Sequence, residues 1–575
     1  MKIYEIVPVA LGKKIPDVLI KNANIVNVFS GKVENSNIAL FKKRIAGIGN
    51  EYKNGKKIID LKGAFILPGL IDAHVHIESS MLSPIEFAKS ILPFGTTTII
   101  ADPHEIANVL GVDGIEYMIK STEGIPLNVY FAIPSAVPAT NFETSGALLG
   151  PEDMVSLVDK YPFRIIALGE VMNFPGVLNC ERELITKIEI LRHKYKKIDG
   201  HAPGLTGKEL NAYIDAFVKS DHECETPTEA LEKLSKGMQI FIREGTAARN
   251  LEALLPAVNI LNHHFFSFCT DDRDPLDINL RGHINGIVKT AIKNGLEPII
   301  AIRMATINTA RYFNLRSMGA IAPGYKADFV VVDDLYNFNI LYVIKDSKIV
   351  AQNGELTVEI SSVFKNVPDT IGCINIVPFE KINLKIKNIG KKIRVISLKK
   401  GTLITDESHI EPKVINGDIV CDPDNDIAKI IVLDRHKASG YSIGFVKGLN
   451  LKNGAIGTTI GHDSHNLAVV GTNDEDIMLA IKQIQKINGG IVVIQNGEVV
   501  SKLALPIAGL MSDKNLNDVN SNLNQLKKSI ELLGCSEDIL MHIHFLQLAV
   551  IPKLKITDKG LVDITKQKIL DIYVD

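Results

Sequence analysis

Hydrophobic and polar positions alternate in short runs between glycine-containing turns over residues 16–67, a pattern typical of a small β-sheet. The runs are DVLIKNANIVNV, NIALFKKRIAGIG and KKIIDLKGAFILPG. A second β-rich stretch, ADFVVVDDLYNFNILYVIKDSKIVAQNGE, spans residues 327–355. We expect both stretches to contribute strands to one composite β-domain, made of residues 1–67 and 319–360, that flanks the intervening chain.

Residues 68–318 repeat an apolar strand-like run, a polar or glycine-containing loop and a segment with helical spacing. The strand-like runs are FILPGLIDAHVH, GTTTIIADPHE, NVYFAIPSA, RIIALGEVM, KIDGHAPG, AFVKSDHE, MQIFIREG and FFSFCTDDRD. The sixth run is short and is also compatible with the end of a helix. Eight strand–helix units in about 250 residues have the size and rhythm of a (β/α)₈ barrel, so the pattern predicts an α/β fold with a central TIM-type barrel.

The rest of the chain indicates a linker and a further domain. Residues 361–380 contain two prolines and no clear period, which is typical of a linker. Residues 381–575 mix strand-like runs such as KIRVISL and GGIVVIQNGEVVS with the helix-like run EDIMLAIKQIQKI. We therefore expect a separate C-terminal α+β domain.

Composition narrows the class of protein. The 64 Lys and Arg nearly balance the 66 Asp and Glu, giving a net charge of −2, and this lack of a basic excess argues against a nucleic-acid partner. No apolar run reaches the roughly 18 residues of a membrane span. The six cysteines are scattered without a CxxC pair, which supports neither a thiolate zinc site nor a disulfide framework. We expect a cytoplasmic protein without a membrane or nucleic-acid partner.

Metal-ligand residue types follow several of the predicted strands. His74 and His76 are spaced i, i+2 on an extended segment, so both imidazoles leave the same face of the strand. One such pair is weak, because chance or a core role explains many of them. Further candidates recur at independent strand ends, which all meet at the C-terminal rim of a barrel. These are Glu170, His201, His222, Asp271 and Asp272.

The motifs also resemble a known family. The stretch LPGLIDAHVHIESS resembles the first barrel strand of the amidohydrolase superfamily. More narrowly, ADPHEIANVLG, ALGEVMNFPGV, GHAPGL, SDHE, FIREGTAARN, CTDDRDP and the C-terminal GHDSHN resemble the bacterial and archaeal adenine deaminases over essentially the whole chain.

The resemblance implies two divalent metal ions per chain, with manganese favoured and iron or zinc as alternatives. The implied ligands are His74, His76 and Asp271 for the first ion, His201 and His222 for the second, and Glu170 as a bridge. The fourth strand carries Glu170 where amide-ring-opening relatives place a carboxylated lysine, which disfavours a hydantoinase or dihydroorotase function.

The resemblance implies hydrolytic deamination of adenine to hypoxanthine and ammonia, a reaction of purine salvage. A divalent metal lowers the pKa of bound water from about 15.7 towards 7, which supplies hydroxide for attack on the weakly electrophilic C6. Asp271 and Glu170 are the expected catalytic residues, with Asp271 carrying the proton from water to the departing amine. Asp272 is a candidate contact to the purine, and the roles of the two aspartates could exchange.

Other polar residues near the rim have both functional and structural interpretations. Substrate contacts are hypothesised for Glu78, His104 and Arg243, together with Ser79, Ser80 and Glu105. For Glu78 and its neighbouring serines, ordering of a loop is an equal alternative. Support of the first-strand histidines is an equal alternative for His104 and Glu105. An ion pair on the rim is slightly favoured for Arg243 and Glu244.

Two histidine-containing segments lie in the predicted C-terminal domain. His462, Asp463, Ser464 and His465 have the residue types of a hydrolytic triad, but consecutive residues do not normally fold onto one another in that geometry. A polar turn is the simpler interpretation, and the family resemblance suggests a loop over the barrel mouth. The HxH in MHIHF lacks evident further ligands, which favours a core or surface role for His542 and His544.

Two rival functions stay open. Another amidohydrolase reaction, such as deacetylation of an amino sugar, also uses glutamate at the fourth strand. A barrel that lost catalysis and serves assembly is the second rival, although all six ligand positions are kept. By analogy with barrel hydrolases that carry large flanking domains, we expect a homo-oligomer such as a dimer, with adenine and water as the small-molecule partners.

Overall fold

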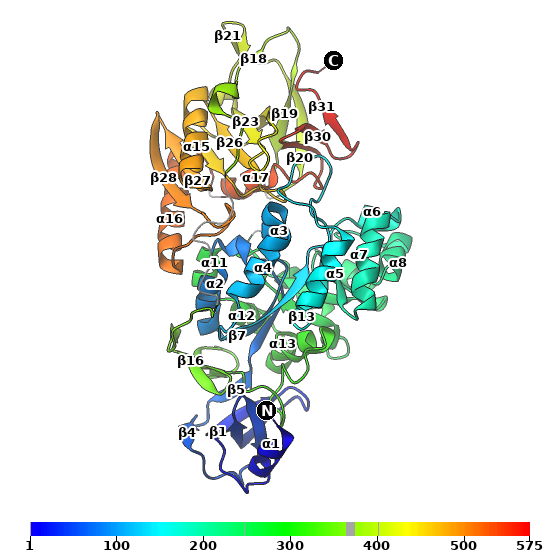
Figure 1. Ribbon diagram of the computed structural model, residues 1–575, viewed down its shortest axis with the longest axis vertical. Helices are drawn as coiled ribbons and strands as arrows, with labels where there is room; N and C mark the ends of the chain where they lie inside the picture. Colours follow the sequence, from blue (N-terminus) through cyan, green and yellow to red (C-terminus); the bar gives the residue numbers. More distant parts are fainter. Residues whose placement is uncertain (1, 247, 364–373, 401, 537, 575) are drawn as a thin grey trace.

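The computed structural model describes residues 2–246, 248–363, 374–400, 402–536 and 538–574. Three tiers follow one another along the long axis of the molecule: a β-domain that contains the N-terminus, a central α/β region and a C-terminal domain (Figure 1). Within the described ranges, no helix has the length and apolar character needed to cross a bilayer. Half of the predicted linker, residues 364–373, lies outside the described residues.

The first tier is a nine-stranded sheet built from both sides of the central region, as predicted. Its order is β17-β16-β15-β14-β5-β1-β2-β3, with β4 paired to β1. The two halves meet where β5 (Phe65–Pro68) runs antiparallel to β14 (Phe329–Val332). The other strands are β1 (Val18–Asn27), β2 (Lys32–Phe41), β3 (Arg44–Ile48), β4 (Lys57–Asp60), β15 (Ile340–Lys345), β16 (Lys348–Gln352) and β17 (Glu355–Leu356). Helix α1 (Ile3–Ala10), which we did not predict, precedes them.

The central tier contains all eight predicted parallel strands. They are β6 (Leu70–Val75), β7 (Thr96–Ala101), β8 (Asn128–Ile133), β9 (Ile165–Val171), β10 (Lys197–Gly200), β11 (Ser220–Asp221), β12 (Gln239–Arg243) and β13 (Phe266–Cys269). Strands β6 to β10 form one paired run and β11 to β13 another. Backbone hydrogen bonds join the two runs, from Lys219 N to Ile198 O at 3.1 Å and from Asp271 N to His74 O at 3.0 Å. The sheet therefore closes into a barrel, and its sixth strand is only two residues long.

Helices cover the outside of the barrel and several begin with local capping signals. Helix α9 (Pro227–Ser235) is an example: Thr226 Oγ1 accepts a hydrogen bond from Glu229 N, and proline occupies the first turn. The outer helices are α2 (Pro84–Ile91), α3 (His104–Leu110), α4 (Val112–Ser121), α5 (Pro151–Lys160), α6 (Phe174–Leu178), α7 (Arg182–His193), α8 (Gly207–Asp215), α10 (Leu251–Leu254), α11 (Pro275–Arg281), α12 (Ile284–Lys293), α13 (Pro298–Met304) and α14 (Ile307–Tyr312).

The C-terminal tier is an α+β domain, as predicted, and contacts the C-terminal rim of the barrel. Its main sheet has the order β20-β19-β24-β23-β26-β25-β27-β28. These strands are β19 (Ile393–Leu398), β20 (Thr405–Ile410), β23 (Ile427–Leu433), β24 (Tyr441–Lys447), β25 (Ala455–Thr458), β26 (Leu467–Gly471), β27 (Gly490–Gln495) and β28 (Glu498–Ala504). Helices α15 (Asp474–Lys486), α16 (Leu516–Leu532) and α17 (Ile539–Phe545) accompany them. Thr144, in the loop after β8, bonds to Asp558 and Asn466, which fixes this domain over the barrel mouth.

Candidate metal centre and active site

The two histidines at the end of β6 point their Nε2 atoms at one place. The His74 and His76 Nε2 atoms lie 3.0 Å apart. Each ring is also hydrogen-bonded at its other nitrogen: His74 Nδ1 is 3.0 Å from Asp199 Oδ2, and His76 Nδ1 is 2.8 Å from the Asp102 carbonyl oxygen. With both Nδ1 atoms donating, the two Nε2 lone pairs are left free side by side, an arrangement that suits the binding of one cation by both rings.

Asp271 completes this first group from the end of β13. Its Oδ1 lies 3.1 Å from His76 Nε2 and 3.4 Å from His74 Nε2. The other oxygen, Oδ2, accepts a hydrogen bond from Arg243 Nη1 at 3.0 Å. Asp271 has a φ of 55°, a conformation that non-glycine residues seldom adopt and that is common at functional sites. The backbone thus turns this carboxylate towards the two imidazoles.

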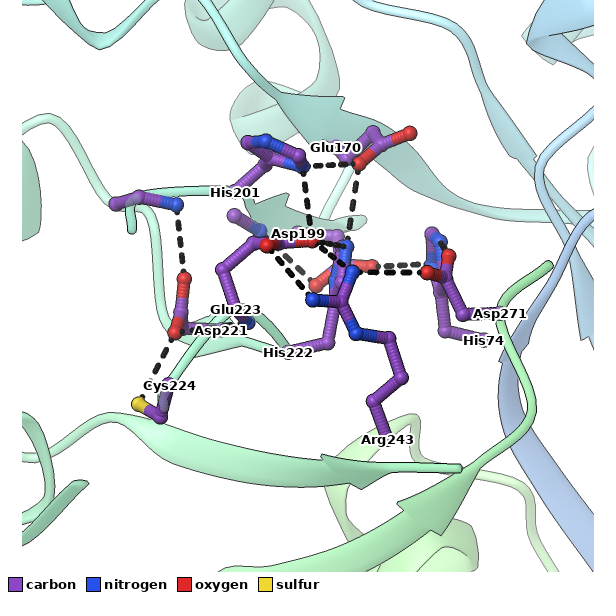
Figure 2. Close-up of polar contacts among 12 residues, drawn as sticks. His74, Glu170, Asp199, His201, Asp221, His222, Glu223, Cys224, Arg243 and Asp271 are labelled. Atoms are coloured by element: carbon purple, nitrogen blue, oxygen red, sulfur yellow. Dashed lines mark hydrogen bonds and ion pairs between the residues drawn. The ribbon is translucent and has the colours of Figure 1, made fainter. Parts of the chain in front are cut away.

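Glu170, at the end of β9, lies between two groups of histidines. Its Oε1 is 3.5 Å from His76 Nε2, whereas its Oε2 is 2.7 Å from His201 Nδ1 and 3.2 Å from His222 Nε2. Figure 2 shows His201 and His222 converging on this carboxylate, with His74 and Asp271 to one side. The six residues predicted as ligands from distant parts of the sequence therefore lie together in two groups that Glu170 can bridge.

The residues fit a pair of divalent cations. The side chains of Glu170, His222, His74 and Asp271 are buried, and the Nδ1 atom of His222 lacks a hydrogen-bond partner among the described residues. Burial disfavours a charged imidazole, but contacts with Asp199 and Asp271 still raise the pKa of His74 well above its usual value. The carboxylates thus favour positive charge here, and imidazole and carboxylate ligands suit Mn, Fe or Zn.

Arg243 forms its ion pairs with carboxylates other than that of Glu244, its neighbour in the chain. Its Nη1 and Nη2 donate to the two oxygens of Glu223, with Nη2 at 2.9 Å, and Nη1 also reaches Asp271. Successive residues of a strand point to opposite faces, so Glu244 points away from Arg243. The ion pair expected on the rim is present with different partners, and it fixes Asp271 from the side opposite the histidines.

Asp272, which follows Asp271 in the chain, lies next to the first metal-ligand group but contacts different residues. Ser79 Oγ is 2.5 Å from Asp272 Oδ1 and 2.7 Å from Glu105 Oε1. Neighbouring Glu78 is buried, and its Oε1 accepts a hydrogen bond from Ile106 N at 3.2 Å. Burial and the nearby Glu105 raise the pKa of Glu78 to about 8. These contacts form a polar wall beside the candidate metal centre.

The C-terminal domain contributes residues to the same site. His104 Nδ1 lies 3.2 Å from Glu170 Oε1, and its Nε2 lies 3.8 Å from Asp463 Oδ1. His462 is the third member of this buried group. The loop 461–466 therefore lies over the barrel mouth, as the family resemblance suggested, and is more than a polar turn. Below it, the His544 carbonyl accepts a hydrogen bond from His462 N, which gives the MHIHF segment a structural role.

Sequence reasoning missed two carboxylates of the site. Asp199 holds His74, and Glu223 holds Arg243 and lies 3.5 Å from His201 Nδ1. Glu223 directly follows the predicted ligand His222 in SDHE, and Asp199 lies two residues before the predicted ligand His201 in KIDGH. Polar residues close to a ligand at a strand end were the available signal.

Comparison with known proteins identifies the family of the chain. A sequence profile described as Amidohydrolase family matches residues 65–350, and one described as Adenine deaminase C-terminal domain matches residues 402–568. The chain is 75% identical to an adenine deaminase of Thermosipho africanus over 575 residues, all of both chains. It is 53% identical to an adenine deaminase of Kosmotoga olearia, over 100% of this chain and 99% of that protein. A solved β-aspartyl dipeptidase from Fervidobacterium islandicum AW-1 is 19% identical, covers 60% of this chain and 98% of its own, and has a TM-score of 0.45. The chain belongs to the adenine deaminase family of amidohydrolases.

Proposed function

We propose that the protein hydrolyses adenine to hypoxanthine and ammonia at the barrel mouth, a reaction of purine salvage. The observation that carries this proposal is the convergence of six buried or half-buried ligand-type side chains, Glu170 among them, at the barrel mouth, in a chain 75% identical to an adenine deaminase over its full length. Two divalent cations, when bound, supply Lewis acidity that ionises water near neutral pH. His74, His76 and Asp271 would hold one cation and His201 and His222 the other.

Asp271 is positioned to move the reaction's proton. Its Oδ1 faces the histidine pair, while Arg243 holds Oδ2, so the carboxylate is oriented without being neutralised by a proton of its own. The arginine and the two histidines hold the pKa of Asp271 well below its usual range, against the effect of burial. In this role Asp271 takes a proton from the water that attacks C6 and returns it to the departing amine as the tetrahedral centre collapses.

Asp272 and His104 are proposed to bind the purine. Asp272 is held by Ser79 and contacts none of the ligand histidines within 4.0 Å among the described residues, which favours Asp271 as ligand and Asp272 as substrate contact. His104 lies between Glu170 and Asp463, next to the reacting centre. Arg243 has both terminal nitrogens engaged by carboxylates, so we now assign it a positioning role on Asp271 in place of a direct purine contact.

The experiment is reconstitution of metal-free protein with Mn, Fe or Zn, followed by assays of ammonia released from adenine and of metal content. We expect two metals per chain and activity with adenine, highest with manganese. Acetate release from an acetylated amino sugar without ammonia release from adenine would favour the rival deacetylase function. Absence of turnover with adenine across all three metals would overturn the proposal.

A further inference from the structure

A cavity of about 700 Å³ lies on the flank of the barrel, separate from the metal centre. It is open to solvent and is lined by residues of helices α11 and α12 and of the segments that follow β12 and β13. Four cationic side chains line it, against two carboxylates, Glu244 and Glu252. The cations are Arg249, Arg273, Arg281 and Lys289. A positive excess in a cavity of this size favours an anionic small molecule.

Arg273 is the buried base of this cavity. It is 3% exposed, and its only described hydrogen bond is a long one of 3.4 Å from Nη1 to the Glu244 carbonyl oxygen. Its Nε has no partner, and it makes no ion pair within 4.0 Å among the residues that the structure describes. The Asp277 and Glu244 carboxylates lie near enough to favour the charge of Arg273, but neither forms an ion pair with it. An anion that reaches its unpartnered Nε would therefore be bound by a charge-assisted hydrogen bond.

The N-terminus of α12 adds a second source of positive potential. The helix begins at Ile284, and Gly282, Asn285 and Gly286 line the cavity around this end. The side chain of the N-cap residue, His283, makes no capping hydrogen bond and instead lies 2.9 Å from Thr96 Oγ1. Helix N-termini carry about half a positive charge and are common phosphate sites.

Carboxylates on the surrounding elements neutralise these four cations only in part. Asp277 pairs with Arg249 at 2.8 Å and with Arg281 at 3.3 Å, one carboxylate for two guanidinium groups. Glu244 Oε2 accepts a hydrogen bond from Leu251 N, and burial raises the pKa of this carboxyl. Lys289 makes no ion pair within 4.0 Å to a described residue.

We propose that this cavity binds the phosphate group of a small anion, with Arg273 at its base, Lys289 and Arg281 at its mouth and the N-terminus of α12 along one wall. Guanidinium groups match the oxygens of phosphate bidentately, which favours phosphate over a simple halide. The ligand is inorganic phosphate itself or a phosphorylated metabolite. The proposal does not depend on the substrate of the barrel.

Occupancy of the cavity is connected to the catalytic segment. Arg273 follows Asp271 and Asp272 directly in the chain, and Thr246 N donates to the Asp272 carbonyl oxygen at 2.8 Å. An anion bound to Arg273 would therefore contact the segment that presents both aspartates to the barrel mouth. The cavity and the candidate metal centre are thus connected through the backbone of residues 271–273, although they share no ligand residue.

The test is isothermal titration calorimetry of the metal-loaded protein with inorganic phosphate, and separately with adenosine monophosphate and adenosine, at constant ionic strength. We expect phosphate to bind, and Lys289→Gln and Arg281→Gln each to raise its Kd about fivefold or more. Lys293→Gln, an exposed lysine of the same helix that does not line the cavity, is the matched control and should leave Kd unchanged.

Tighter binding of adenosine monophosphate than of phosphate, with the same dependence on Lys289, would identify the ligand as a phosphorylated metabolite. Equal or weaker binding of adenosine monophosphate would identify the ligand as inorganic phosphate itself. Phosphate bound at the metal centre would be insensitive to Lys289→Gln and to Arg281→Gln. An unchanged Kd in both variants, or no binding of phosphate or of the monophosphate, would overturn the proposal.

Discussion

Asp199 accepts a hydrogen bond from His74, with Oδ2 and Nδ1 3.0 Å apart beneath the candidate metal centre. The other Asp199 oxygen is bonded to Gly200 N and Ser220 Oγ, so the carboxylate has little freedom to move. This contact sets the tautomer of His74, placing its proton on Nδ1 and leaving the Nε2 lone pair for a metal. The finding makes Asp199 a positioning residue for a ligand on another strand.

The Asp199→Asn variant should therefore bind metal about 10–100-fold more weakly, because an amide holds the ring less firmly and lowers its basicity. Competition with a chelator measures this affinity directly. Asp215→Asn, on the exposed surface of α8, is the control and should match the wild type. Equal metal affinity in Asp199→Asn would show that the contact is incidental.

The two neighbouring aspartates should separate in their effects. Asp271→Asn should lose at least one metal per chain and about 10²–10⁴-fold in kcat, because its carboxylate faces both histidines and is proposed to carry the proton. Asp272→Asn should retain both metals and raise KM, because its partner is Ser79 and no imidazole. Metal analysis with steady-state kinetics on adenine measures both. The reverse pattern would exchange their roles.

Asp463 tests whether the C-terminal domain takes part in catalysis. Because Asp463 faces His104 across 3.8 Å and is buried, Asp463→Asn should lower kcat/KM at least about tenfold while two metals per chain are retained. Asp513→Asn, an exposed carboxylate of the same domain, is the control. Wild-type kcat/KM in Asp463→Asn would restrict the loop to covering the barrel.

The sequence predicted the barrel well because most of its strands carry an apolar run with a polar end, a signal local to the chain, whereas β11 is only the polar pair Ser220–Asp221. It also predicted that β5 and β14 belong to one flanking domain, from two β-rich stretches of similar pattern. The family resemblance suggested that the loop 461–466 lies over the barrel mouth, but the contact between His104 and Asp463 was not predicted, because it joins residues more than 300 positions apart and nothing in their local pattern encodes it. Asp199 was missed for a related reason: a carboxylate that supports a metal ligand lies at no characteristic distance from that ligand in the sequence.

Acid should destabilise the C-terminal domain through two histidines, His436, which is half-buried, and His544, which is buried. Burial, aided by Arg435 next to His436 and by His462 next to His544, lowers the pKa of both to about 3. The unfolded chain binds these protons near pH 6.5 and the folded chain does not, so stability is complete above pH 6.5 and is lost as pH falls towards 3. Between pH 6.5 and pH 5 each histidine should cost about 2 kcal/mol of unfolding free energy.

Replacing one of them isolates this contribution. His544→Gln should reduce by about 2 kcal/mol the difference in unfolding free energy between pH 7 and pH 5, because glutamine does not titrate. Urea titrations followed by tyrosine fluorescence at both pH values measure that difference within each variant, so any loss of packing common to both pH values cancels. His409→Gln, at an exposed position of β20, should leave the difference as in the wild type. If His544→Gln loses as much stability in acid as the wild type does, His544 is protonated in the folded domain and burial does not set its pKa.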